Sequence, residues 1–171
     1  MISVVIPVYN EVGNIDILYN QLTKILSKLG SYEIIFVDDG SNDGSFRKIE
    51  ELHKRDKRIK CIRFRWNFGQ TAAIDAGLRY ANGDIIVTMD ADLQNDPADI
   101  PELIDKLKEG YDLVNGWRYN RRDKLFSKKI PSLISNWLVR KLTRVNLHDQ
   151  GCTLRALRKE SVKDLKLYGE M

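Results

Sequence analysis

Two aspartates, Asp90 and Asp92, stand just after a run of apolar residues in the stretch TMDADLQNDP, residues 88–97. In an extended segment, residues two apart point to the same side, about 6.5–7 Å from each other. Two neighbouring carboxylates repel each other unless a cation or protons intervene. Carboxylates suit Mg²⁺ or Mn²⁺, which commonly binds one or two of them plus phosphate oxygens, and Gln94 adds a neutral oxygen. The spacing allows a metal site, but a lone Asp-x-Asp is common in turns and helix caps, and taken alone it favours capping.

A second acidic cluster follows another apolar run, in VDDGSNDGS at residues 37–45. An acid at such a strand end can accept hydrogen bonds from a nucleobase N–H or from ribose hydroxyls. The alternative is an ordinary turn in which Asp43 caps the next helix. The sequence has neither Gly-x-Gly-x-x-Gly nor Gly-x-x-x-x-Gly-Lys, so the usual dinucleotide and P-loop sites are unsupported. The diphosphate of a nucleotide would then have to be held by the metal.

Alternating strand-like and helix-like stretches must position these acids. Apolar runs predict strands over 2–8, 33–39, 59–64, 84–90 and 111–116. Helices are expected between them, over 17–29, 45–56, 70–81 and 97–110. This alternation predicts a Rossmann-like open α/β fold, a mostly parallel sheet with helices on both faces. Ligands of such sheets bind beyond the carboxyl ends of the strands, where the acidic clusters at 7–11, 37–41 and 89–94 converge.

The alternation breaks down after Gly116, where a basic segment begins. Residues 117–144 contain nine Lys or Arg and a single acid, a net charge of +8, so the rest of this +4 chain carries −4. That charge suits an anionic partner such as a phosphate, lipid headgroups or nucleic acid, and the alternative is a solvated helix face. We expect a loop, then a helix over 127–142, and a further strand within 152–157.

These features predict two parts of one domain. Residues 1–116 form a nucleotide-sugar-binding half, and residues 117–171 form an acceptor-side basic segment that ends without a finishing element, as in a truncated domain. At 43% hydrophobic and 30% charged residues the chain is typical of a globular protein. It has no stretch of roughly 20 apolar residues and no signal-type start, so a cytoplasmic location is expected. The two cysteines and two histidines have no zinc-ligand spacing.

Four motifs, in this order and spacing, carry a family resemblance: VVIPVYNE, FVDDGSNDGS, NFGQTAAIDAG and MDADLQNDP. Together they resemble the nucleotide-sugar domain of family 2 glycosyltransferases with the GT-A fold. The nearest likeness is to the dolichol-phosphate mannosyltransferase and polyprenyl-phosphate glycosyltransferase branch, for which DADLQ is a distinctive signature. The resemblance covers essentially the whole chain.

The resemblance implies roles for individual residues. The pocket for base and ribose would be lined by Pro7, Tyr9, Glu11, Val37 and Asp39. The ribose and diphosphate would lie along Asp90, Ala91 and Asp92, with Asp92 and Gln94 as protein ligands of Mg²⁺ or Mn²⁺. The adjacent loop would be shaped by Asn67, Gly69 and Gln70.

The basic segment acquires a role from the same resemblance. Similar enzymes hold the acceptor lipid phosphate with an Arg after the fifth strand and an Arg and a Ser on the following helix. Arg118 and Ser132 match two of these positions, and Lys128 stands at the third, which keeps the charge but loses the bidentate fork. Trp117 and Thr153 also replace residues that are usually small, Thr153 standing where Gly is usual.

The function expected from these residues is inverting, metal-dependent transfer of a sugar from GDP-mannose or a UDP-hexose to dolichyl or polyprenyl phosphate. The catalytic residues would be Asp92, Arg118, Lys128 and Ser132. The protein would be peripheral on the cytosolic face of an anionic membrane, without nucleic acid as partner, and the sequence indicates no oligomeric state. One alternative is a sugar or protein hydroxyl acceptor with Asp149 as general base. Another is a non-catalytic nucleotide-binding module.

Overall fold

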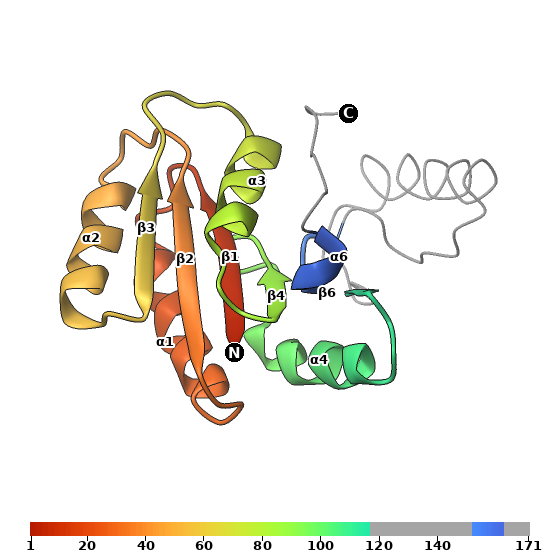
Figure 1. Cartoon of the computed structure of the whole chain (residues 1–171). Helices are drawn as coiled ribbons and strands as arrows, with labels where there is room; N and C mark the ends of the chain where they lie inside the picture. The colour runs from red at the N-terminus through yellow and green to blue at the C-terminus, as the bar shows by residue number, and fades with distance from the viewer. Residues whose placement is uncertain (117–151, 163–171) are drawn as a thin grey trace, which may run out of the picture.

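The computed structural model describes residues 1–116 and 152–162, and the expected alternation of strands and helices is present in them (Figure 1). The strands are β1 (Ile2–Val8), β2 (Tyr32–Asp38), β3 (Ile59–Arg63), β4 (Ile85–Thr88), β5 (Leu113–Asn115) and β6 (Arg155–Arg158). The helices are α1 (Ile15–Leu26), α2 (Ser45–Arg55), α3 (Gln70–Tyr80), α4 (Ile100–Lys108) after a short 3₁₀ turn η1 (Pro97–Asp99), and α6 (Lys159–Val162). The helix expected over 127–142 lies outside the described residues.

The described strands form one sheet in the order β3-β2-β1-β4-β6-β5. The first four positions in this order are parallel, as the alternation predicts. The strand expected at 111–116 is present as β5, but β5 does not pair with β4 directly. Instead β6 inserts between β4 and β5 and runs antiparallel to both. The stretch expected as a strand at 152–157 therefore becomes an internal strand that buries Ala156 and Leu157.

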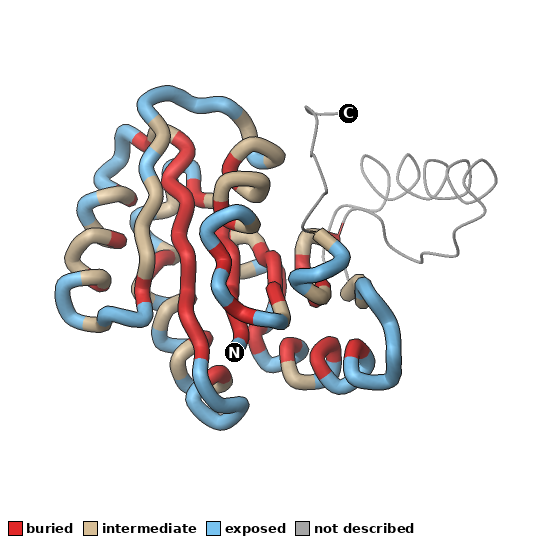
Figure 2. The backbone as a smooth tube through the Cα atoms, in the orientation of Figure 1, coloured by how far each residue is buried: buried red, intermediate tan, exposed pale blue. Residues whose placement is uncertain are grey.

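Helices cover both faces of the sheet, so the sheet is the middle of three layers. On one face, buried side chains of α1, α2 and α4 pack against Val4, Ile6, Ile34 and Phe36 in the larger core cluster. On the other face, α3 packs on Val5, Ile35, Val37 and Ile86, and Val162 of α6 reaches the same cluster. The interior strands β1 and β2 are accordingly buried along almost their whole length (Figure 2). This burial on both faces explains why their sequences read as continuous apolar runs.

The strand register brings three chain segments to one edge of the sheet. Val8 at the end of β1 is paired with Asp38 at the end of β2. The pairing of β1 with β4 ends at Val5 and Thr88, and the amide of Met89 then donates to Val5 O at 3.2 Å. The residues after β4 therefore run alongside the end of β1.

No helix in the described part of the chain is long and apolar enough to cross a membrane.

Candidate functional site

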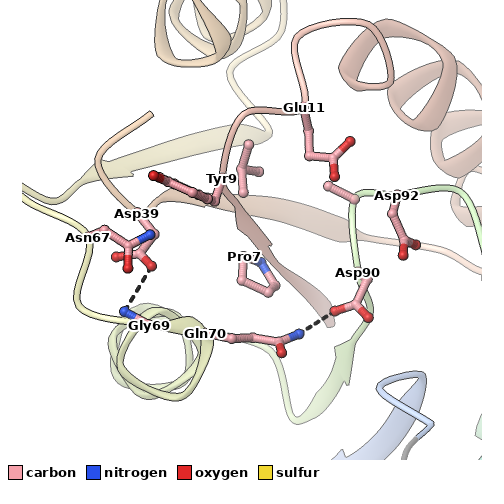
Figure 3. A pocket seen from close by; sticks show the side chains of 11 residues that line it. Pro7, Tyr9, Glu11, Asp39, Asn67, Gly69, Gln70, Asp90 and Asp92 are labelled. Carbon is pink, nitrogen blue, oxygen red and sulfur yellow. Dashed lines mark hydrogen bonds between the residues drawn. The ribbon is translucent and has the colours of Figure 1, made fainter. Parts of the chain in front are cut away.

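A pocket of about 370 Å³ lies at this carboxyl edge of the sheet (Figure 3). Its walls come from the ends of β1, β2 and β4 and from the start of α3. It is lined by Pro7, Val8, Tyr9, Glu11, Asp39, Asn67, Gly69, Gln70, Asp90, Ala91 and Asp92. The structure thus brings together most of the residues that the sequence singled out for the nucleotide-sugar site, together with the three loop residues expected next to it.

Asp39 holds the loop that closes one side of the pocket. Its Oδ1 accepts from the amide of Phe68 at 2.7 Å, and its Oδ2 accepts from the amide of Gly69 at 2.9 Å. The Gly69 contact is drawn in Figure 3. Charge-assisted bonds of this kind are roughly twice as strong as neutral ones. Asp39 therefore fixes the loop before α3 against the end of β2.

Asp90 is held from two sides. Its Oδ1 accepts from the side-chain amide of Gln70, the first residue of α3, as Figure 3 shows. Its Oδ2 accepts from the hydroxyl of Thr153 at 2.7 Å. Neither contact could be predicted from the sequence, because the partners are 20 and 63 positions away from Asp90.

Asp92 is the carboxylate of the pair that is better placed to bind a cation. Its Oδ1 accepts from the amide of Gln94 at 3.0 Å, and no other hydrogen bond to its side chain is made within residues 1–116 and 152–162. Leu93 has a positive φ of 61°, so the chain turns directly after Asp92. Gln94 therefore does not continue the extended segment of Asp90 and Asp92, so its side chain does not point to the same side as theirs. The Gln94 side chain is exposed and is not part of the pocket wall.

Val37 also differs from its expected role. Its side chain is fully buried in the smaller core cluster, beneath α3, and it is not among the residues that line the pocket. Val37 instead packs in the core beneath α3, the helix whose first residue, Gln70, lines the pocket. The strand's alternation gives the physical reason: Asp39 lies on the same face as Val37 but beyond the end of the strand, where the pocket opens.

Asp43 is not the N-cap of α2, which is Gly44, but its side chain organises the turn just before that helix. Its Oδ1 accepts from the amide of Ser45 at 2.9 Å, at the start of α2, and its Oδ2 accepts from the amide of Val12 at 3.0 Å. Burial would raise the pKa of Asp43, but the hydrogen bonds from Ser45 and Val12 outweigh it and lower the pKa. Asp43 thus organises the turn behind the pocket, while Asp39 faces into it.

The chemistry of the pocket wall fits a divalent cation. Among the described residues that line the pocket, four are acids and none is Lys or Arg. A diphosphate would be repelled by this wall unless a cation lay between them. Residues 1–116 and 152–162 contain no group of three or more His, Cys, Asp or Glu side chains that could hold a metal ion. The acids of the wall are oxygen ligands of the kind that Mg²⁺ takes, one or two carboxylates together with phosphate oxygens and water.

The acceptor residues expected from the sequence, Arg118, Lys128 and Ser132, and the alternative base Asp149 lie outside the described residues. The residues that flank this segment are described. The amide of Gly116 donates to Leu154 O at 2.8 Å, and Arg155 Nε donates to Asn115 Oδ1 at 2.9 Å. The residues before and after the segment are thus hydrogen-bonded to each other through β5 and β6, and β6 pairs with β4. Thr153, just before β6, contacts Asp90 of the pocket.

Comparison with known families agrees with this geometry. The model of glycosyl transferase family 2 matches residues 3–166. The chain belongs to glycosyl transferase family 2. The resemblance seen in the four motifs is thereby confirmed, and so is the GT-A type of α/β fold expected from it.

Similar members of the family include enzymes named for polyprenyl phosphates. The chain is 42% identical over 173 residues to dodecaprenyl-phosphate galacturonate synthase of Rhizobium johnstonii, covering 99% of this chain and 51% of that protein. It is 42% identical over 164 residues to undecaprenyl-phosphate 4-deoxy-4-formamido-L-arabinose transferase of Aeromonas hydrophila subsp. hydrophila, covering 95% of this chain and 50% of that protein. This family 2 chain therefore spans about half the length of the relatives it matches.

Solved structures support the fold. Glucosyl-3-phosphoglycerate synthase of Mycobacterium tuberculosis, in complex with Mn²⁺ and uridine-diphosphate-glucose, superimposes with a TM-score of 0.75 at 22% identity. The match covers 96% of this family 2 chain and 58% of that protein. The same enzyme in complex with uridine-diphosphate gives a TM-score of 0.74.

Proposed function

We propose that this chain is the sugar-transferring domain of an enzyme that moves a sugar, with inversion, from a nucleoside diphosphate sugar to a polyprenyl phosphate. The observation that carries the proposal is the acidic pocket, in which Asp90 and Asp92 line one side and Asp39 lines the opposite side (Figure 3). The names of the two relatives supply the acceptor class.

The base and ribose of the donor would lie over Pro7, Tyr9 and Asp39. The side chain of Tyr9 is about half exposed at the pocket rim, so its ring is available to a flat ligand. Each carboxylate oxygen has two acceptor positions, so Asp39 can accept from a base or ribose donor while it keeps its bonds to the loop. GDP-mannose and UDP-hexoses are the donors we expect.

Asp92 would hold the metal, Mg²⁺ or Mn²⁺, with Gln94 as a second protein ligand only if its side chain turns inward. A bound divalent ion stabilises the negative charge that develops on the departing diphosphate. Asp90, which accepts hydrogen bonds from Gln70 and Thr153, would accept further hydrogen bonds from the donor next to that centre. The donor is thus held at both ends by residues of one sheet edge.

The acceptor would be bound by Arg118, Lys128 and Ser132. A phosphate acceptor is already anionic near neutral pH, so it needs no general base, and these residues would orient it rather than activate it. Gly116, two positions before Arg118 in the sequence, bonds to Leu154, and the preceding residue Thr153 contacts Asp90, which supports this assignment. The basic segment would also bind the cytosolic face of an anionic membrane. Sedimentation with anionic vesicles at low salt, if it showed no preference over neutral vesicles, would count against that part.

Isothermal titration calorimetry of GDP, UDP and their sugar conjugates with Mn²⁺, Mg²⁺ or EDTA tests the donor half of the proposal. We expect one nucleotide to bind only with metal, and Asp92→Asn to weaken it by roughly 100-fold. Asp105→Asn is the matched control, because Asp105 is an exposed residue of α4 that pairs only with Lys108 among the described residues. Equal binding in EDTA and in Mn²⁺ would overturn the metal-dependent site.

A transfer assay tests the acceptor half. A labelled nucleotide sugar is offered a short polyprenyl phosphate or the corresponding polyprenol. We expect product from the phosphate alone, with the anomeric configuration opposite to that of the donor by NMR. Transfer to the alcohol would favour the hydroxyl-acceptor alternative instead.

A further inference from the structure

The hydroxyl of Thr153 links the strand β6 to the candidate donor pocket. Thr153 Oγ1 donates to Asp90 Oδ2 at 2.7 Å and accepts from the side-chain amide of Asn95 at 3.1 Å. Because a hydroxyl has a single hydrogen, the bond from Asn95 leaves that hydrogen directed at Asp90. Asn95 is buried, so the arrangement is held in place from behind.

This hydroxyl is not needed to dock β6 onto the sheet. The backbone carbonyl of Thr153 already accepts from the hydroxyl of Thr88 at 2.8 Å. The antiparallel ladder then pairs Thr88 with Arg155 and continues to Ile85 and Arg158. The hydrogen bond from Thr153 Oγ1 to Asp90 is therefore separate from the bonds that hold β6 in the sheet. Its effect is to fix the position of the Asp90 carboxylate.

Thr153 and Gln70 together form a partition between two hollows. Gln70 lines the candidate donor pocket and also a second, more apolar hollow of about 340 Å³, which Thr153 lines from the β6 side. Asp90 stands between them and accepts one hydrogen bond from each. Two donors on opposite oxygens restrict the rotation of the carboxylate, so Asp90 is presented to the pocket in one orientation.

We propose that Thr153 is a positioning residue, which orients the Asp90 carboxylate for the nucleotide sugar through its hydroxyl. The inference rests on the proposed function and adds a residue to it. Glycine, which the family resemblance gives as usual at this position, has no hydroxyl to make either contact.

The test compares Thr153→Val, which keeps the shape and removes the hydroxyl, with Thr153→Ser, which keeps the hydroxyl. Thr71→Val is the matched control, because Thr71 lines the same second hollow and does not line the donor pocket. Affinity for the metal–nucleotide complex is measured by calorimetry, and the melting temperature of each variant is recorded. We expect Thr153→Val to weaken binding by about fivefold to thirtyfold. Thr153→Ser and Thr71→Val should stay within about twofold of the wild type.

A double variant separates positioning from a merely structural role. If Thr153 acts through Asp90, adding Thr153→Val to Asp90→Ala costs no further affinity, because the carboxylate that Thr153 orients is already removed. Additive losses in the double variant, or wild-type affinity in Thr153→Val, would overturn the positioning role alone. Failure of the folded wild-type chain to bind any nucleotide with metal would overturn the proposed function and this inference together.

Discussion

Gly77 of α3 lies directly against Val5 of β1. A Cβ atom at Gly77 would overlap Val5 Cγ1 and would stand 3.3 Å from Val37 Cγ2. The absence of a side chain at Gly77 therefore sets how closely α3 approaches the sheet. This approach also matters for the pocket, because Gln70 at the start of the same helix reaches Asp90.

Gly77→Ala should destabilise the protein by about 1–3 kcal/mol, since overpacking a core contact costs this much. The sign of the change in the free energy of unfolding tests the close contact. Alanine is the better helix former by about 1 kcal/mol, so the substitution would stabilise α3 if there were space for the side chain. Urea unfolding measures the difference. Gly13→Ala is the control: nothing lies within 4 Å of a Cβ there, and we expect no loss of stability. Equal stability of Gly77→Ala and the wild type would refute the close contact.

Gly40→Ala should damage the pocket as well as the fold. Gly40 has a φ of +73°, and a Cβ there would lie 2.7 Å from the carbonyl carbon of Trp66. The displaced loop carries Asn67 and Gly69 of the pocket wall. We expect lower stability and nucleotide affinity reduced by about tenfold or more, measured by thermal unfolding and calorimetry.

Gly30→Ala provides the comparison for Gly40→Ala. Gly30 also has a positive φ, +116°, but no atom lies within 4 Å of its Cβ position. This substitution should cost about 1 kcal/mol of backbone strain and leave nucleotide affinity unchanged. If the two variants lose affinity equally, the contact between Gly40 and the loop has no role in the pocket.

Glu33 should make the protein acid-sensitive. Burial would raise the pKa of Glu33, but hydrogen bonds from Lys60, Ser3 and Asn82 outweigh it and lower the pKa. The folded state therefore binds this proton less readily than the unfolded state, so the stabilisation is present above the ordinary value of 4.5 and is lost as the pH falls below it. Glu33→Gln should cost about 2–3 kcal/mol at pH 7 and flatten the acid limb of stability against pH.

Glu50→Gln is the control for Glu33→Gln. Glu50 pairs with Lys54 on the exposed surface of α2, where an ion pair contributes at most about 0.5 kcal/mol. Its removal should leave both the stability and the acid limb nearly unchanged in urea unfolding from pH 3 to pH 7. An unchanged acid limb in Glu33→Gln would show that other carboxyl groups cause the acid sensitivity.

Asp38 should have the opposite effect on stability. Its side chain is fully buried, and neither carboxylate oxygen has a hydrogen-bond partner in the described structure. Burial raises the pKa of Asp38, and the neighbouring Ser41 and Arg63 offset this only in part. Folding thus favours the protonated form, so this group's contribution becomes less favourable as the pH rises through its ordinary value.

Asp38→Asn removes the buried charge and should stabilise the protein by about 1 kcal/mol at pH 8, with the gain disappearing at pH 4. The free energy of unfolding at the two pH values measures this difference. A loss of stability at pH 8 would show that the ionised carboxylate is stabilised in the folded protein, for instance by Arg63, whose Nε lies 3.6 Å from Asp38 Oδ2.

Local patterns in the sequence determined much of the fold. The runs at 2–8 and 59–64 and the helix at 70–81 agree with β1, β3 and α3 to within a residue. Periodicity works here because each element buries one face or both faces in a single layered core. The acidic strand ends also converge on one pocket, because the carboxyl ends of parallel strands share one sheet edge.

Only the tertiary structure decided the pairings between distant segments. β6 lies between β4 and β5 in the sheet. This order could not be predicted from local sequence patterns, because it depends on how all the strands pack together. The side chain of Gln94 leaves the pocket wall because Leu93 turns the backbone, while Val37 is covered by α3. The sequence by itself thus determined the family and the acidic residue types that stand at the strand ends. Asp90 accepts hydrogen bonds from Gln70 and from Thr153, which lie 20 and 63 positions away from it in the sequence. These bonds form only in the assembled sheet, because only the folded chain brings these distant segments together.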